Sequence, residues 1–432
     1  MVHHENVQIT RSAAIPWGIV GVLMAQAALA HFNRVSISVA GSERLMTEFA
    51  LTETELGMIY SAFLLAYTLF MLPGGWVIDR AGAVTALTLM GIGTSLFVIL
   101  TGVLGLFPAA ISLLTLVIVR FCAGAMSAPL HPAAAQTVAQ VIPPGQRTFI
   151  NGMVTGAAII GVAVTFGVFG WMMDRFGWPT AFILSGILTL LLAMLWWTVT
   201  VPLRRTASAA PCASDRKEFN TLLRDHRILL LTISYATIGY FEYLFFYWLQ
   251  HYLFKVHALS ITESRWYATI PTLAMAFGMP FGGWLSDRLT SIGCSRSVIP
   301  VCGMVLSAVL VGAGLCCRHP GPAVFCFALA MAGAGACEGP FWTMATHLGG
   351  ERGGLSAAIV NTGGNAGGML APFVTPLLSS ILGWSGAISI AGGLCLSGAI
   401  LWYWIDMDDH PPESATAPSA EAISTRSTQV MI

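Results

Sequence analysis

Charged residues are scarce in this 432-residue chain. Only 9% of the residues are Asp, Glu, Lys or Arg, whereas 56% are apolar; a soluble domain carries about 25% charged residues. The 20 basic and 20 acidic residues cancel, so no net charge favours nucleic acid or a polyanionic surface as a partner. These values exclude an ordinary soluble enzyme and predict a chain that is solvated mainly by lipid.

The sequence also lacks the patterns of common catalytic and metal sites. Its nine cysteines are an odd number, and most lie inside apolar runs, which is typical of small buried side chains and not of a disulfide framework. No zinc-type spacing, nucleophile elbow, Walker loop or pair of catalytic carboxylates occurs. We therefore expect no enzyme activity, no metal and no cofactor, with a proton or other cation gradient as the energy source.

Apolar runs, in contrast, recur along nearly the whole chain. A helix needs about 20 apolar residues to cross a bilayer, and a spanning segment is helical because hydrocarbon offers free backbone groups no partner. The first run is too long for a signal peptide and contains an arginine, so we expect it to stay as a span. The twelve runs predict an all-α membrane protein and lie at 15–40, 56–78, 84–106, 109–131, 150–172, 178–200, 227–250, 266–286, 298–317, 322–345, 355–381 and 384–405.

The longest polar interruption divides the spans into two sets of six. It covers 204–226. The tail is rich in Ser, Thr, Ala, Pro and Glu, a composition typical of disorder. We expect a cytoplasmic N-terminal segment (1–14), a six-helix bundle (15–200), a central cytoplasmic loop (201–226), a second six-helix bundle (227–405) and a disordered cytoplasmic tail (406–432).

Lysine and arginine are unevenly distributed between the two sides of the predicted membrane. With the N-terminus inside, thirteen of the loop cations face the cytoplasm and five face outward. The positive-inside rule then places both termini and the central loop in the cytoplasm. We expect a multi-pass protein of a bacterial inner membrane that functions as a monomer.

The two halves repeat each other. The segment 74–80 (GGWVIDR) recurs at 282–288 (GGWLSDR), an offset of 208, and the Gly-Trp pair at 177–178 recurs at 383–384, an offset of 206. Internal repetition of this kind is typical of transporters built from related halves. It predicts two pseudo-symmetric six-helix bundles.

The first repeated segment resembles the signature loop of the major facilitator superfamily. The pattern Gly-x-x-x-Asp-Arg-x-Gly runs from Gly75 to Gly82, although Ala83 and Val84 replace the usual basic residues just beyond it. The resemblance covers essentially the whole chain and implies that family's 6+6 fold. It also implies a latch between the bundles on the cytoplasmic face, with a plain solvated turn as the alternative. The latch residues would be Gly75, Asp79, Arg80, Gly283, Asp287 and Arg288.

Three shorter motifs resemble the anion:cation symporter group of that superfamily, whose members carry organic anions. They are 32–40 (FNRVSISVA), Arg120-Phe121 and 143–147 (PPGQR). The resemblance implies import of a small carboxylate, such as a sugar acid, by alternating access and proton symport. An uncoupled facilitator, a drug or metabolite efflux carrier and a ligand-sensing transceptor stay open as alternatives.

Four charged residues lie deep in apolar spans. Arg34 and Arg120 belong to the N-terminal half, and Glu242 and Glu338 belong to the C-terminal half. A central Arg costs about 2.5–3.5 kcal/mol, and Arg grips a carboxylate with two parallel hydrogen bonds. We expect both arginines to bind an anionic substrate near the midplane. Ion pairing with the two glutamates across the bundle is the alternative.

The resemblance also bears on the coupled proton. Many carriers of the anion group have Asp directly before the first-span Arg and Glu seven residues after the fourth-span Arg, and these acids are thought to carry the proton. Here the positions hold Asn33 and Ser127. The internal repeat, at an offset of 211, sets Ser127 opposite Glu338. We therefore expect Glu338 to be the leading proton carrier and Glu242 the second.

Further residues are expected beside the substrate. His31 lies three residues before the first deep arginine, hence on the same helical face; in the anion group an aromatic often stands there, and a satisfied core histidine is the alternative. Tyr243 or Tyr247 would offer hydroxyl groups, although most aromatics of the seventh span pack or form the interfacial belt. In the eleventh span we favour Asn365 over Asn361 as a partner for substrate hydroxyls.

Overall fold

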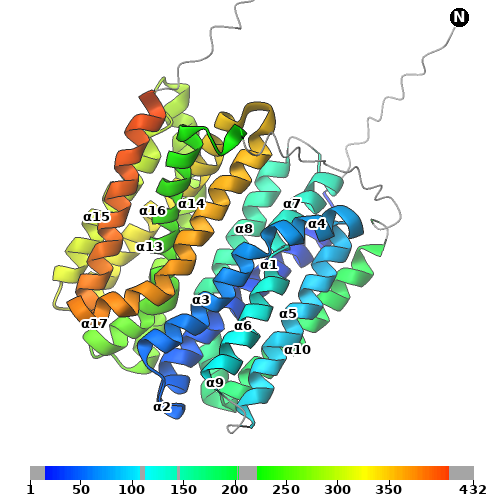
Figure 1. Ribbon diagram of the computed structural model, residues 1–432, viewed down its shortest axis with the longest axis vertical. Helices are drawn as coiled ribbons and strands as arrows, with labels where there is room; N and C mark the ends of the chain where they lie inside the picture. Colours follow the sequence, from blue (N-terminus) through cyan, green and yellow to red (C-terminus); the bar gives the residue numbers. More distant parts are fainter. Residues whose placement is uncertain (1–14, 108–111, 144–145, 202, 204–220, 408–432) are drawn as a thin grey trace, which may run out of the picture.

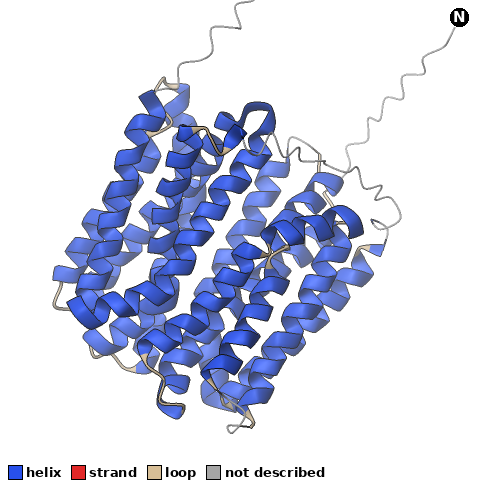
Figure 2. Ribbon diagram, in the orientation of Figure 1, coloured by secondary structure: helices blue, strands red, loops and turns tan. Residues whose placement is uncertain are grey.

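The protein is helical throughout the part that the structure describes. The computed structural model describes 15–107, 112–143, 146–201, 203 and 221–407, without the side chains at 72, 79, 148 and 351. No strand occurs in these ranges (Figure 2). Most of the predicted central loop (201–226) and of the tail (406–432), and the N-terminal segment (1–14), lie outside them.

The N-terminal half contains six membrane-crossing segments, three of which consist of two consecutive helices (Figure 1). A π-helical turn, η1 (Gly41–Leu45), and the short α2 (Met46–Glu48) follow the first segment. Another π-helical turn, η4 (Thr165–Phe169), joins the two helices of the fifth. The segments are α1 (Trp17–Ala40), α3 (Glu53–Leu69) with α4 (Met71–Ala81), α5 (Ala83–Gly105), α6 (Leu113–Ser127) with α7 (Leu130–Val141), α8 (Arg147–Val164) with α9 (Gly170–Phe176), and α10 (Trp178–Val199).

The C-terminal half forms a second group of helices beside the first (Figure 1). Its last helix is two spans in one, because Gly383 has a φ of 71°, which breaks the helix. A 3-10 turn, η5 (Gly350–Arg352), precedes it. The helices are α13 (His226–Val256), α14 (Ile261–Ser291), α15 (Val298–Cys316), α16 (Pro320–Gly349) and α17 (Gly353–Met407).

The described residues thus form the twelve predicted spans. Eight segments are long and apolar enough by themselves to cross a membrane. The spans formed by α1, by α3 with α4, and by α14 fall short of that test. The fourth predicted span (109–131) ends too early, because the helix continues as α7 to Val141. Pro132 does not stop it there, since it lies in the first turn of α7, where a backbone N–H has no helical partner.

The predicted repeat of the halves is visible in the backbone. Gly177 (φ 79°) ends α9, and Gly383 (φ 71°) divides α17, each directly before a tryptophan. Glycine adopts positive φ without the steric cost that other residues meet. The repeated Gly-Trp pair is therefore a sharp break between two helices in both halves.

The halves pack closely along α3 and α17. A Cβ atom on Gly57 would lie 2.2 Å from the carbonyl oxygen of Pro372, so only glycine allows this approach. One turn further along α3, Ser61 Oγ donates a hydrogen bond to the carbonyl oxygen of Met369 at 2.7 Å. The halves also meet where α8 packs against α14 and where α1 packs against α13.

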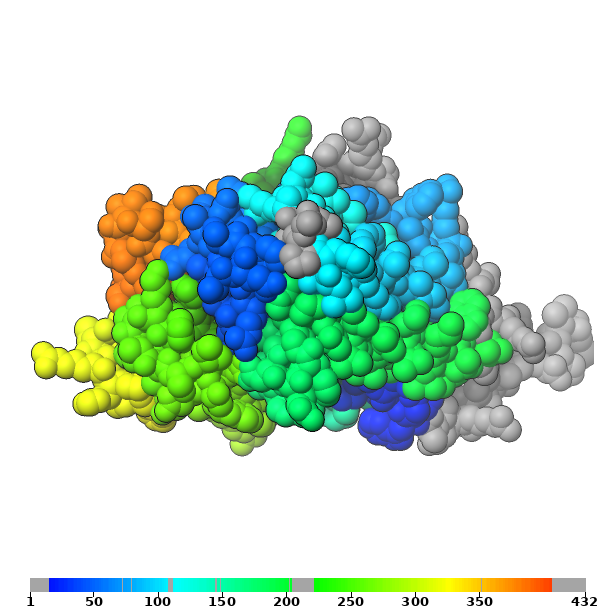
Figure 3. Space-filling model, turned by 90° about the horizontal axis from the view of Figure 1, so that it is seen from below, coloured from blue at the N-terminus to red at the C-terminus, as the bar shows by residue number. Residues whose placement is uncertain are grey.

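The two ends of the molecule differ in how the halves meet. We call the end at which α2 lies the α2 end, and the opposite end, where α4 meets α5, the α4 end (Figure 1). Viewed from the α2 end, the surface of the residues that follow α1 (blue) lies against the C-terminal half (light green) in Figure 3. This end is therefore covered by contacts between the halves.

Candidate functional site

Arg34 lies in the middle of α1 and is almost completely buried, at 6% exposure. Its guanidinium carbon is 4.7 Å from the ring centre of Tyr67, 5.0 Å from that of Tyr243 and 5.5 Å from that of Phe63. Such cation–π contacts stabilise a buried cation. The Nε and Nη2 atoms nevertheless have no hydrogen-bond partner among the described residues. Arg34 is thus a buried cation that is surrounded by aromatic rings and has unused hydrogen-bond donors.

Arg120, on α6, is buried at 2% exposure and has a different role in this state. Its Nη2 donates a hydrogen bond of 2.9 Å to the carbonyl oxygen of Arg34, and its guanidinium carbon lies 4.6 Å from the ring centre of Phe63. The Nε atom has no partner. Arg120 therefore braces α1 against α6 and keeps one donor free.

The C-terminal half completes the cage from α13. The Tyr243 ring faces Arg34, and Tyr247 Oη donates a long hydrogen bond of 3.4 Å to the carbonyl oxygen of Arg34. The two tyrosine rings are stacked with centres 6.3 Å apart. Both tyrosines expected beside the substrate thus lie at the buried arginine, which is enclosed by residues from both halves.

A small cavity lies against Arg34. Its volume is about 10 Å³, the space of roughly one water molecule. His31, one helical turn before Arg34, lines it and has a second histidine, His131 of α7, beside its ring. Asn33 points elsewhere: its Nδ2 donates to Thr189 Oγ1 at 2.7 Å.

The two deep glutamates lie together in the C-terminal half. Glu338, on α16, accepts hydrogen bonds from Tyr235 Oη at 2.9 Å and from Trp342 Nε1 at 3.3 Å. Glu242, on α13, lies within electrostatic reach of Glu338, and its Oε1 has no hydrogen-bond partner. Glu338 is therefore held by two donors, and Glu242 is not.

The two deep arginines and the two deep glutamates are not paired in this structure. Among the described side chains, neither arginine forms an ion pair with Glu242 or Glu338, and no acid lines the cavity at Arg34. The alternative of ion pairing across the bundle is therefore wrong for this state. The sequence indicates how deep a residue lies in a span, but not the rotation of its helix, and the rotation directs the acids toward Tyr235 and Trp342.

The glycine-rich run in the first part of α17 brings helices together. A Cβ atom on Gly367 would lie 1.9 Å from the carbonyl oxygen of Ala236, on α13. Asn365 Nδ2 donates to the carbonyl oxygen of Asn361 at 2.9 Å and lies 3.9 Å from Met71 Sδ, on the other half. Asn365 therefore lies where the halves meet, with most of its hydrogen bonding used within its own helix.

The α2 end holds a group of paired charges that joins the halves. Arg265, at the start of α14, contacts Glu43 through Nε at 2.8 Å and through Nη2, and Asp174 through Nη1 and through Nη2 at 3.1 Å. The Arg265 and Glu43 side chains are both only 4% exposed. Gln250 of α13 also donates to Glu43. Fork-shaped pairing of this kind fixes geometry as well as charge.

A second inter-half contact lies beside this group. Glu53, in the first turn of α3 and ahead of its apolar part, contacts His251 Nε2 at 2.9 Å and Lys255 Nζ. Partial burial by itself would raise the pKa of the Glu53 carboxyl, but the hydrogen bonds from His251 and Lys255 outweigh it and lower that pKa to about 2. Glu53 therefore stays ionised, and the contact stays charged, at ordinary pH.

Backbone features place these charges. The π-helical turn η1 carries Glu43 and begins at Gly41, where a Cβ atom would lie 2.2 Å from Tyr60 Oη. At the end of η4, a Cβ atom on Gly170 would lie 2.4 Å from Arg265 Nε, so the arginine side chain runs along this glycine. π-Helical turns are often found at functional sites. Here both adjoin the charge group that joins the halves.

The predicted latch residues lie at the α4 end. Gly75 and Gly283 have open space where a Cβ would stand, whereas a Cβ on Gly282 would lie 2.2 Å from the carbonyl oxygen of Ala336. Gly282, and not the predicted latch residue Gly283, therefore permits the close approach of α14 to α16. Arg80 lies 4.0 Å over the ring of Trp76. The Asp79 side chain is outside the described part of the structure.

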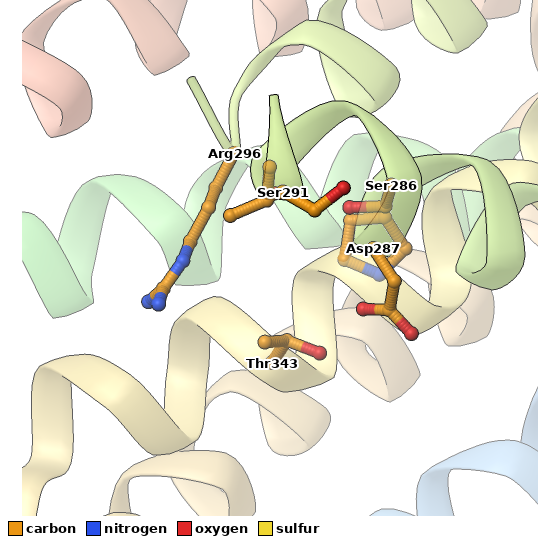
Figure 4. A pocket seen from close by; sticks show the side chains of 7 residues that line it. Ser286, Asp287, Ser291, Arg296 and Thr343 are labelled. Atoms are coloured by element: carbon orange, nitrogen blue, oxygen red, sulfur yellow. The ribbon is translucent and has the colours of Figure 1, made fainter. Parts of the chain in front are cut away.

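A pocket of about 330 Å³ opens beside the second latch segment. Asp287 and Arg296 stand on opposite sides of it, and Thr343 of α16 lies across from them (Figure 4). Between described residues, the ion pairs that join the two halves all lie at the α2 end. The latch therefore stays a prediction.

Two features were missed in the sequence: the charge group at the α2 end and the facing of His31 and His131. Glu43, Asp174 and Arg265 lie near span ends, where charged residues are common, so none of them alone indicates a role. The usable signal was that acids of one half and a cation of the other half occur at the same predicted membrane level. No sequence signal brings the two histidines together, because their contact depends on helix rotation.

Comparisons with known proteins agree with this architecture. The sequence profile of the Major Facilitator Superfamily matches residues 23–354 and 231–430. The chain is 27% identical over 424 residues to the probable galactarate/D-glucarate transporter GudP of Bacillus subtilis (strain 168), covering 91% of this chain and 92% of that protein. It is 26% identical over 400 residues to the D-galactonate transporter of Escherichia coli O6:H1, covering 86% and 91%.

A solved structure shows the same fold. The inward-facing, unoccupied crystal structure of a bacterial homolog of the human lysosomal transporter Spinster superposes with a TM-score of 0.75 at 17% identity, covering 91% of this chain and 98% of that one.

The chain belongs to the Major Facilitator Superfamily, and it is a multi-pass transporter, not an enzyme. The predicted fold class and the predicted likeness to the sugar-acid carriers of this superfamily are confirmed.

Proposed function

We propose that this protein imports a sugar acid into the bacterial cell across the inner membrane, with Arg34 as the anchor for the substrate carboxylate. The observation that carries the proposal is the buried guanidinium with two unpartnered N–H groups inside an aromatic cage. Unpartnered donors are costly in a buried site. A carboxylate would satisfy them with two parallel hydrogen bonds, and the galactarate, D-glucarate and D-galactonate of the relatives' names all carry one.

The surroundings of Arg34 suit the rest of such a molecule. Sugar acids carry several hydroxyl groups on a short carbon chain, and the phenol groups of Tyr67, Tyr243 and Tyr247 offer donors and acceptors for them. Asn365 lies further along the contact between the halves. We assign specificity for hydroxyl groups to these side chains and the anchoring of charge to the arginine.

The size of the cavity supports transport by alternating access. The room beside Arg34 is about that of one water molecule, whereas a sugar acid has more than ten heavy atoms. The halves must therefore move apart to admit it. Rocking of two bundles about a midplane site is the established behaviour of this architecture.

The distribution of basic residues orients the protein. The sequence carries thirteen loop cations on the predicted cytoplasmic side, among them Arg80, Arg147 and Arg288 at the α4 end, and five on the other side; from the positive-inside rule we take the α2 end to be outside and both termini to be in the cytoplasm. The charge group around Arg265 then closes the outer side of the site. We assign it the role of an outer gate.

Proton coupling is assigned to the pair of acids in the C-terminal half. Two carboxyl groups that approach each other without a cation repel when both are charged, so such a pair is suited to hold a proton. Glu338 has the better-defined surroundings, with donors from Tyr235 and Trp342. We therefore take Glu338 as the proton carrier and Glu242 as its partner.

The test is uptake by purified protein in liposomes with an acidic exterior. Radiolabelled D-glucarate and D-galactonate are compared with neutral D-glucose and with the lipophilic cation tetraphenylphosphonium. We expect accumulation of a sugar acid alone, and a loss of about 100-fold in Arg34→Gln, because a charge-assisted bidentate contact is removed. The control is Arg318→Gln, an exposed loop residue that should transport normally.

The other outcomes identify the alternatives. Movement of the lipophilic cation would indicate a drug carrier. Sugar-acid entry that ignores the pH gradient would indicate an uncoupled facilitator, and binding without flux would indicate a sensor. Equal uptake by the wild type and Arg34→Gln would remove the arginine from the substrate site.

A further inference from the structure

Two histidines from different helices face each other beside Arg34. The ring centres of His31 (α1) and His131 (α7) are 5.3 Å apart, with the ring planes at 67° in an edge-to-face arrangement. His31 is buried at 9% exposure, and His131 is only partly buried. His31, Arg34 and Leu130, the neighbour of His131, line the same small cavity. The ring pair is therefore part of the arginine site.

One hydrogen bond fixes which nitrogen of His31 is free. Its Nδ1 lies 3.0 Å from the carbonyl oxygen of Ala27. A carbonyl oxygen can only accept, so Nδ1 carries the hydrogen in this bond, and in the neutral ring the lone pair is on Nε2. No described residue makes a hydrogen bond to Nε2. His31 thus has a basic nitrogen available for a proton.

The groups around the ring pair do not supply a negative charge. Both rings lie within electrostatic reach of the Arg34 guanidinium. The acid that would be expected near Arg34 is replaced by Asn33, which hydrogen-bonds Thr189 and Ser185. The charged or titratable side chains at the arginine site are Arg34 of α1, Tyr67 of α3, Arg120 of α6, and Tyr243 and Tyr247 of α13. Two further cations of the surrounding helices have their contacts elsewhere: Arg80 of α4 lies over Trp76, and Arg147 of α8 donates to the carbonyl oxygens of Ala139 and Ile142 near the end of α7.

Of the titratable residue types at this site, histidine has the ordinary pKa that lies closest to neutral pH. Tyrosine titrates near pH 10 and arginine above pH 12, whereas histidine titrates between about pH 5 and pH 8. A proton on the ring pair beside Arg34 places two positive charges together, which is unfavourable while the site is empty. A carboxylate bound to Arg34 cancels one of these charges.

We propose that His31 and His131 form a proton-binding site whose occupancy is linked to that of the anion on Arg34. When a carboxylate binds the guanidinium, one proton from water binds the pair, with His31 Nε2 as the acceptor; when the anion leaves, that proton is released. Linkage is reciprocal, so a proton on the pair also tightens anion binding. The inference rests on the proposed function in one respect: it needs an anion at Arg34.

This site is separate from the acids of the C-terminal half. Glu338 and Glu242 lie on α16 and α13 among Tyr235 and Trp342, and neither lines the cavity beside Arg34. The ring pair therefore senses the substrate charge directly. It therefore binds a second proton, besides the one assigned to the acid pair, and this second proton binds together with the anion.

The first measurement counts protons taken up on binding. D-galactonate and D-glucarate are titrated calorimetrically into the purified protein at pH 7 in buffers of different ionisation enthalpy. We expect the wild type to take up about one proton per anion, and His31→Gln and His131→Gln to take up less than half of that. His319→Gln, a change in an exposed loop, serves as the control. Unchanged uptake in both histidine variants, with binding retained, overturns the proposal.

The second measurement needs no substrate. The imidazole nitrogens are followed by ¹⁵N NMR against pH in the wild type and in Arg34→Gln, with the two signals assigned by His31→Gln and His131→Gln. Removal of the guanidinium should move the titration of the pair about one pH unit upward, and Arg318→Gln should not. If the pair titrates alike with and without Arg34, the linkage is absent.

The two measurements separate the two proposals. If the wild type binds neither sugar acid, the proposed function fails, and the NMR titration still decides whether the rings and Arg34 are linked. If the sugar acids bind without proton uptake, the proposed function stands and the ring pair is a packing contact.

Discussion

The midplane and the α2 end of this transporter carry opposite charge patterns. At the midplane the cations, Arg34 and Arg120, belong to the N-terminal half, and the acids belong to the C-terminal half. At the α2 end Glu43 and Asp174 of the N-terminal half face Arg265 of the C-terminal half, and there the charges pair. At the midplane they do not.

The difference separates charges that pair with other residues of the protein from charges that, in the proposed account, bind the substrate. Buried ion pairs stabilise an interface only when geometry is good and every group is satisfied. Arg265 meets that condition with bonds to two acids. Arg34 does not, since two of its nitrogens have no partner. In the proposed account, the paired group around Arg265 closes the outer gate and Arg34 binds the substrate.

The largest expected effect comes from breaking the paired region. Arg265→Gln leaves Glu43 without its cation and Asp174 with the exposed Arg44 alone, and the loss of one partner of a buried ion pair costs about 3–5 kcal/mol. The closed state of the α2 end should weaken by about 100-fold or more. Spin labels are placed at Arg175 and Ala258, which are exposed residues of the two halves. The distance between the labels, measured by double electron–electron resonance, would report the opening.

Arg44→Gln is the matched control for this measurement. Arg44 also contacts Asp174, at 3.0 Å, but lies in the same half and is 41% exposed. An exposed pair is worth about 0–1 kcal/mol. Equal label distances in Arg265→Gln and the wild type would show that the charge group does not hold the halves together.

The next effect sharpens the comparison at the midplane. Glu338→Gln keeps the hydrogen-bonding shape of the side chain but cannot release a proton. We expect exchange of sugar acid across the liposome membrane to continue and uphill accumulation under a pH gradient to fall about tenfold or more. Glu263→Gln is the control, because this exposed residue caps α14 and glutamine also serves in a capping box. Full accumulation by Glu338→Gln would exclude that residue as the proton carrier.

The smallest effect concerns pH at the α2 end. The pKa of Glu53 is lowered to about 2 in its contact with His251 and Lys255, below the ordinary value of about 4.3. Its contribution to closure is therefore complete above about pH 4.3 and is lost as the pH falls toward 2. The label distance in the wild type should not respond to Glu53 between pH 5 and pH 8.

Glu53→Gln removes the charge at every pH. This variant should show at neutral pH the opening that the wild type shows only in strong acid. Lys255 is half exposed, so solvent weakens the contact and the change in closure should stay within about threefold. A wild-type protein that opens near pH 6 in a manner abolished by Glu53→Gln would contradict the lowered pKa.

Much of the fold was predictable because lipid imposes simple rules. Span length, the six-plus-six division and the repeated Gly-Trp breaks at Gly177 and Gly383 follow from hydropathy and from the conformational freedom of glycine. The boundaries were less certain, and α7 extends ten residues beyond the predicted end of the fourth span. Pro132 follows that predicted end directly, but it lies in the first turn of α7, where proline is tolerated.

The sequence identified individual residues of the candidate site, but it did not predict how they are arranged around one another. The depth of Arg34 followed from its place in an apolar run. Its neighbours Tyr67 and Phe63 come from another helix, and which face of that helix points inward depends on packing. For the same reason, the sequence did not reveal that Glu338 turns toward Tyr235 or that His31 meets His131.

The central claim is that Arg34 binds the carboxylate of the substrate, and a thermodynamic cycle tests it most directly. D-galactonate and its uncharged amide, D-galactonamide, are titrated into the wild type and Arg34→Gln. We predict a coupling of about 2–3 kcal/mol, so that the wild type prefers the acid by about 30-fold or more and the variant does not distinguish the two. An equal preference for the acid in both proteins would contradict the account.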